Sequence, residues 1–80
     1  MIIEIFKSAN ELKNNFSISY KVIENSGDYF IEAETEGGKY SEIAFLGNCG
    51  AEKAIALGHL LAEKAVRPIH LEDVISDLRF

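Results

Sequence analysis

One cysteine and two histidines are the side chains of this chain best suited to act on a substrate. Cys49 stands in the segment Gly47-Asn48-Cys49-Gly50, directly before a predicted helix. A thiol there lies near the positive end of the helix dipole and near free backbone N–H groups, which lower its pKa and favour the thiolate. His59 or His70 would then serve as the base. The competing interpretation is an ordinary strand-to-helix turn, which we favour because the spacing supplies no third, orienting group.

Four side chains with metal-binding donors flank the junction of two predicted C-terminal helices. His59 and Glu63 are four residues apart on the first helix, and His70 and Asp73 open the second. Converging from both helices, they could hold a divalent metal ion. Any two helices offer such spacing, however, and His70 has a plainer role in hydrogen bonding to backbone groups or to Asp73 or Asp77. We therefore predict no metal, no cofactor and no catalytic residue, and expect a protein that is not an enzyme.

Glutamates recur at every second position of one predicted strand. Glu32, Glu34 and Glu36 have the period of a strand and share one face, and Glu42 lies on the neighbouring strand. One interpretation is a solvated outer sheet face. The other is an acidic docking surface for a basic protein, with Phe30 as an exposed apolar contact on the same face.

Composition and length describe one small domain, residues 1–80. The chain is 48% hydrophobic and has a net charge of −5. The acidic residues are concentrated in residues 24–42, which hold six acids and one lysine. A single cysteine excludes an internal disulfide, so stability must come from packing, to which self-association would add. The scattered basic residues argue against direct binding to nucleic acid or to anionic lipid. No stretch approaches the roughly 18 apolar residues of a membrane span, and the start lacks a signal-peptide pattern, so we expect a cytoplasmic protein.

The first half of the chain has the pattern of four short strands. They are predicted at residues 2–6, 16–22, 29–35 and 40–46. Tight turns at 25–28 and 36–39 make the last three antiparallel neighbours, whereas the first strand could pair at either edge. In the fourth strand we expect Ile43 and Phe45 to point into the core. A capping-box spacing also indicates a helical turn over residues 9–14.

Two amphipathic helices are predicted after the strands, joined at Pro68. The apolar arc of the first helix holds Ala51, Ala54, Ile55, Gly58, Leu61, Ala62 and Ala65, and the stripe of the second holds Leu71, Val74, Ile75 and Leu78. The small residues of the first helix would let its backbone lie close to the sheet. Pro68 cannot continue that helix but fits the first turn of the next. The sequence thus predicts an α+β fold, an antiparallel meander of three to four strands (β-β-β-β-α-α) covered on one face by two C-terminal helices.

The C-terminal segment resembles the ending of a known family. Residues 65–78 fit the pattern V-x-P-x-H-L-x-D-V-x-x-D, and the matching positions are Val66, Pro68, His70, Leu71, Asp73, Val74 and Asp77. This ending is similar to that of DUF6514, a domain-of-unknown-function family of small clostridial and bacillar proteins. Arg67 departs from the family, in which a small hydroxylated residue often precedes the proline and would cap the helix. The resemblance implies short strands and a leucine-rich helix, and it implies no activity.

Taken together, these observations predict a small acidic interaction or regulatory module. We expect it to dock a basic protein partner through its sheet face, and the residues assigned to this contact are Phe30, Glu32, Glu34, Glu36 and Glu42. A homodimer is compatible with the same features. Two alternatives stay open: a small-molecule or metal-binding sensor at the helix–helix corner, and a phage-type inhibitor that shields a nucleic-acid-binding enzyme.

Overall fold

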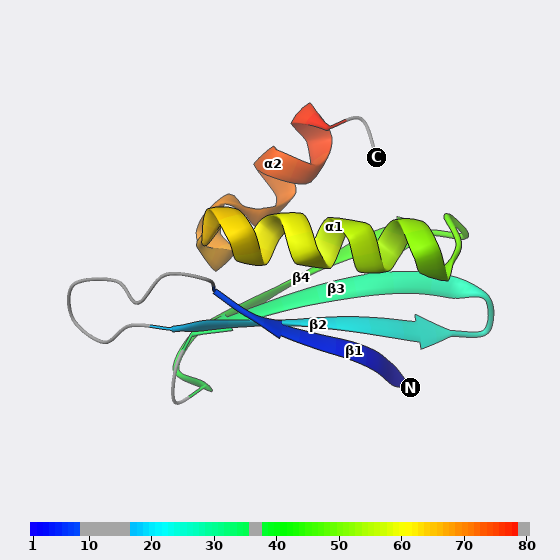
Figure 1. The fold of residues 1–80 in the computed structure, drawn as a ribbon, viewed down its shortest axis with the longest axis horizontal. Helices are drawn as coiled ribbons and strands as arrows, with labels where there is room; N and C mark the ends of the chain where they lie inside the picture. The colour runs from blue at the N-terminus through cyan, green and yellow to red at the C-terminus, as the bar shows by residue number, and fades with distance from the viewer. Residues whose placement is uncertain (9–16, 36–37, 79–80) are drawn as a thin grey trace.

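The computed structural model describes residues 1–8, 17–35 and 38–78, and the helical turn predicted at 9–14 lies outside them. The elements in chain order are β1 (Ile2–Lys7), β2 (Ile18–Asn25), β3 (Asp28–Thr35), β4 (Ser41–Gly47), α1 (Ala51–Lys64), the 3₁₀ turn η2 (Pro68–His70) and α2 (Leu71–Asp77). The four strands form one antiparallel sheet in the order β1-β2-β3-β4, and both helices lie on the same face of it (Figure 1). This confirms the predicted α+β meander and places the first strand beside β2.

The turn between β2 and β3 sets the register of the two central strands. Asn25 pairs with Asp28, so Ser26 and Gly27 alone form the turn, with φ angles of 54° and 88°. Two consecutive positive φ angles define the type I′ hairpin, whose twist matches that of the flanking strands. The N–H of Gly27 also donates to Oε2 of Glu24 at 2.9 Å. The sequence predicted this turn correctly, and it aligns the whole of β2 with β3.

The core lies between the inner face of the sheet and the two helices. Its buried residues are Ile18, Tyr20, Val22, Ile31, Ala33, Ala44, Ala54, Leu57, Leu61, Ala62, Leu71 and Ile75. The helix lies close to the strands at Gly58, where a Cβ atom would be 3.0 Å from the Phe6 ring and 3.0 Å from Cγ2 of Val22. The expected close approach of the small-residue face is therefore present, although Ala51 is exposed and Leu57, outside the predicted arc, is buried.

The junction between the helices is fixed by backbone geometry and one tyrosine. Ala65 takes a left-handed conformation (φ 50°), and the N–H groups of Ala65 and Val66 return to carbonyls of the last helical turn. These bonds form a Schellman motif, which ends α1. The buried Pro68 then opens η2, as predicted, while Arg67 before it makes no side-chain cap. The hydroxyl of Tyr20 donates to the carbonyl oxygen of Val66 at 2.6 Å and so ties the junction to the sheet.

The prediction that Ile43 and Phe45 point into the core is wrong by one residue. Ile43 is 53% exposed and Phe45 63% exposed, whereas Ala44 between them is buried. Residues 43–46 are all apolar, so alternation along β4 cannot say which set faces inward. Pairing with β3 decides it, because Ala44 lies opposite the buried Ile31.

Candidate functional site

The sheet face turned away from the helices, here called the outer face, carries three rows of side chains that cross all four strands. The pairing registers give an apolar row of Ile2, Ile23, Phe30 and Phe45, a mixed row of Ile5, Lys21, Glu32 and Ile43, and a polar row of Lys7, Ser19, Glu34 and Ser41. In an antiparallel sheet, directly opposed residues share a face, so each row is a line of neighbours. The outer face thus changes from apolar to polar along the strands.

The apolar row is a continuous exposed strip. The rings of Phe30 and Phe45 pack against each other with centroids 5.2 Å apart and an interplanar angle of 58°. At the opposite edge Ile2 is 50% exposed, and Ile23 and Phe30 between the edges are half-buried. An antiparallel sheet with one face in water normally turns polar side chains outward. The apolar row departs from that rule, because it crosses the full width of the sheet and contains no polar side chain.

An irregularity in β1 adds a second isoleucine to this face. The pairing of β1 with β2 shifts between Ile2 and Glu4, so Ile2 and Ile5 both lie on the outer face although they are three residues apart. A bulge of this kind inserts an extra residue and changes which side chains share a face. Ile3 packs against the core instead. Strict alternation along the strand cannot predict this arrangement, because the shift in register appears only when β1 pairs with β2.

Among the described residues of the three rows, the charges are balanced, with two lysines and two glutamates. Lys21 lies directly opposite Glu32, and its Nζ is 3.9 Å from Oε1 of Glu34 on the diagonal. Lys7 lies at the polar end of the same face. Lys21 stands between the buried Tyr20 and Val22, and this alternation was the signal in the sequence for its position on the outer face.

The four glutamates assigned to an acidic surface do not form one surface. Glu32 and Glu34 lie on the outer face, but Glu42 lies opposite Ala33, whose side chain is buried on the helix side. The hydroxyl of Tyr40 donates to Oε2 of Glu42 at 2.7 Å, and this bond raises the pKa of Tyr40. Glu36 lies outside the described residues.

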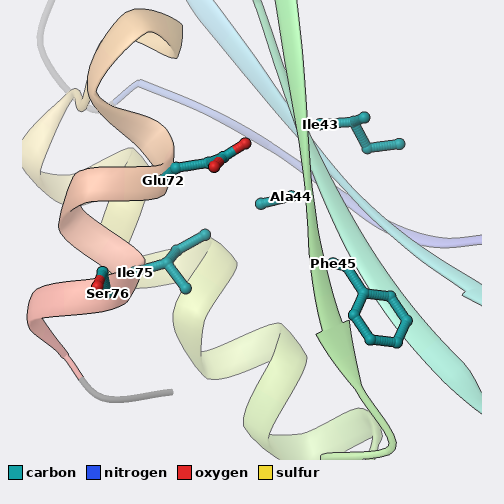
Figure 2. Close-up of a pocket in the computed structure, with 6 residues that line it drawn as sticks. All are labelled: Ile43, Ala44, Phe45, Glu72, Ile75 and Ser76. Carbon is teal, nitrogen blue, oxygen red and sulfur yellow. The ribbon is translucent and has the colours of Figure 1, made fainter.

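A groove runs along the exposed edge of β4, beside the outer face. It has a volume of about 390 Å³, and its lining residues are Ile43, Ala44, Phe45, Glu72, Ile75 and Ser76. Figure 2 shows Ala44 and Ile75 pointing into the space between β4 and α2, while Ile43 and Phe45 point away from the helix. Ile43 and Phe45 therefore belong both to the rim of the groove and to the outer face.

The helix–helix corner holds a smaller cavity, and the four weak metal-ligand candidates do not line it. Its volume is about 230 Å³, and it is lined by Thr35, Tyr40, Arg67, Pro68 and Ile69. Across the described ranges, no three His, Cys, Asp or Glu side chains gather in a group that could hold a metal ion. All four weak candidates, His59, Glu63, His70 and Asp73, are exposed instead, and the His59 ring packs edge-on against Phe6 with centroids 5.8 Å apart. The metal-binding alternative therefore lacks its site in this part of the chain.

Cys49 lies apart from both histidines. Its half-buried thiol is 3.5 Å from the carbonyl oxygen of Gly50, the residue that precedes the first turn of α1. The rise of a helix separates Ala51 from His59 by about 12 Å along the axis, and His70 lies beyond the far end. No cysteine–histidine pair is formed.

None of the described helices is long and apolar enough to cross a membrane.

No family model matches the chain, and no curated protein or solved structure matches it either. The resemblance of residues 65–78 to DUF6514 stays a prediction.

Proposed function

We propose that this protein is a non-enzymatic interaction module that binds another protein through its outer face. The apolar row carries the proposal, because it crosses all four strands while the described helices lie on the opposite side. Contiguous exposed apolar surface on a small soluble domain marks an interaction site more often than chance exposure. Aromatic side chains such as Phe30 and Phe45 are also enriched at the centres of protein interfaces.

The charge on this face favours a partner of mixed charge over a strongly basic one. Lys7 and Lys21 stand among Glu32 and Glu34, so the rows carry two charges of each sign. Opposed charges beside an apolar contact fix orientation and exclude wrong partners more than they add affinity. The expectation of a basic partner depended on an acidic surface that included Glu42, which lies on the other side of the sheet.

The test compares two equally exposed apolar residues. Phe45 is 63% exposed on the outer face, and Ile69 is 67% exposed at the helix corner, so Phe45→Asp and Ile69→Asp introduce the same charge at sites of similar accessibility. We expect a protein partner, either another chain or a second copy, to be retained by the wild type and by Ile69→Asp and lost by Phe45→Asp. Affinity capture combined with measurement of the molecular mass in solution covers both kinds of partner. Equal retention by the two variants would contradict the proposal.

A further inference from the structure

We propose that the occupant of the outer face is a second copy of this chain, in a symmetric dimer whose two-fold axis runs between β2 and β3, roughly along the strands. This inference rests on the proposed function and names its partner. Three features support it: the order of side chains within each row, the positions of the charges, and the area available.

The order of the rows makes the outer face complementary to itself. Two sheets packed face to face keep their strand directions within about 30° of each other. A two-fold axis between β2 and β3 places β1 over β4 of the second copy and β2 over its β3. Each row then meets the same row of the second copy in reverse order.

Reversal pairs apolar side chains with apolar side chains. In the apolar row, Ile2 meets Phe45 of the second copy and Ile23 meets its Phe30. In the mixed row, Ile5 meets Ile43 of the second copy. The isoleucine added to this face by the bulge in β1 thus has an apolar counterpart.

Reversal also pairs opposite charges. Lys21 meets Glu32 of the second copy, and the symmetry repeats this contact, so two cross-copy pairs form at the centre of the mixed row. A two-fold axis running across the strands through this row would instead place Lys21 on Lys21 and Glu32 on Glu32. Because a buried charge is costly without a partner, the charges select the axis along the strands. The neighbouring Glu34, 3.9 Å from Lys21, gives the lysine a second acidic contact within its own sheet.

The area fits a reversible dimer. Four strands at the usual spacing, each about six residues long, present roughly 400 Å² in plan, so two copies bury on the order of 1,000 Å². This lies at the low end of specific interfaces. We therefore expect a dimer that dissociates on dilution in the micromolar range.

The experiment exploits the symmetry by mixing two single variants. Lys21→Glu makes positions 21 and 32 both acidic, and Glu32→Lys makes both basic, so each variant alone sets like charges against each other across the axis. In a mixed dimer, each contact between position 21 of one copy and position 32 of the other joins opposite charges. We expect the wild type to sediment at about twice 8.9 kDa at high concentration. Each variant alone should dissociate with a Kd raised about tenfold or more.

Recovery in the mixture is the decisive result. Native mass spectrometry with one variant labelled with ¹⁵N should show dimers containing one copy of each variant. Each variant loses the same contacts within its own sheet whether pure or mixed, so a folding defect cannot produce this recovery. Lys64→Glu and Glu63→Lys make the same charge changes on the exposed side of α1, and both variants should dimerise as the wild type does.

Three outcomes would overturn the inference. A wild type that stays monomeric up to millimolar concentration excludes the second copy. A dimer that neither variant weakens uses another surface, and variants that fail to recover on mixing exclude this axis. If the chain is monomeric but Phe45→Asp still abolishes capture of a different protein, the inference fails while the proposed function stands.

Discussion

At the scale of single residues, Tyr20 stabilises the fold both by burial of its ring and by a hydrogen bond from its hydroxyl. Its side chain is fully buried, yet its hydroxyl has a partner, the carbonyl oxygen of Val66 at 2.6 Å. Burial raises the pKa of Tyr20 to about 12, from 10.0 for an exposed tyrosine. The same residue therefore anchors the helix junction and makes stability depend on pH in alkaline solution.

We predict that the free energy of unfolding falls between pH 10 and pH 12. Below pH 10 both states hold the proton of Tyr20, and as the pH rises toward 12 the unfolded chain releases it while the folded chain retains it. Because the folded-state pKa is the raised one, this stabilisation is present below pH 10 and is lost as the pH rises through 12. The loss amounts to about 2–3 kcal/mol, measurable by urea denaturation at successive pH values.

The control for this prediction is Tyr20→Phe. This variant leaves the Val66 carbonyl without its partner, so it should be about 1–2 kcal/mol less stable at pH 7. It should also lose the part of the pH dependence that belongs to Tyr20. The same alkaline slope in both proteins would contradict the assignment.

At the scale of elements, the packing of α1 on the sheet depends on the missing side chain of Gly58. A Cβ atom at this position would lie 3.0 Å from Cδ2 and Cε2 of Phe6 and from Cγ2 of Val22. Such contacts are tighter than ordinary van der Waals packing, so a neighbour must move. The ring of Phe6 also contacts His59 edge-on, which restricts its movement.

We predict that Gly58→Ala destabilises the protein by about 1 kcal/mol. Alanine gains about 1 kcal/mol over glycine in helix propensity, while overpacking costs roughly 1–3 kcal/mol. Chemical denaturation of Gly58→Ala and of the reverse change Ala56→Gly, at an exposed position of the same helix, separates the two effects. A net gain in stability equal to the loss seen in Ala56→Gly would mean that the ring moves without cost.

The strands show how small irregularities decide which side chains meet. The shift of one residue in β1 adds an isoleucine to the outer face, and a second shift in the pairing of β3 with β4 falls between Tyr29 and Phe30. Beyond that shift Phe30 lies opposite Phe45, and their rings meet. The apolar row therefore depends on pairing register as much as on residue type.

At the scale of the whole molecule, the described helices cover one sheet face and leave the other without a helix against it. A chain of 80 residues buries a small apolar core, so burial of the outer face in a complex would add directly to stability. Association that occurs only between folded chains makes the melting temperature depend on protein concentration.

We predict that the melting temperature of the wild type rises with protein concentration across the micromolar range. Phe45→Asp should remove this dependence, because the aspartate would face apolar side chains of the second copy. Ile69→Asp should preserve it, since Ile69 lies at the helix corner. Differential scanning calorimetry at several concentrations measures the effect, and a melting temperature independent of concentration in all three proteins would contradict it.

Local patterns in the sequence determined the elements and their order. The 3.6-residue periodicity of residues 51–64, the proline at 68 and the turn residues Ser26 and Gly27 act through backbone preferences that need no distant contact. For this reason the antiparallel strands and the two helices could be predicted, and with them the inward faces of β2 and β3 but not that of β4.

Only the tertiary structure decided which side chains share the outer face. Residues 43–46 are apolar on both sides, so the inward position of Ala44 depends on its pairing with Ile31. The register shift in β1 breaks the alternation of side chains that would otherwise predict which face each residue occupies. Pairing between β2 and β3 places Lys21 beside Glu32 and Glu34. A change of one residue in register reverses the face of every side chain beyond it, and register is set by contacts between segments that are distant in the chain.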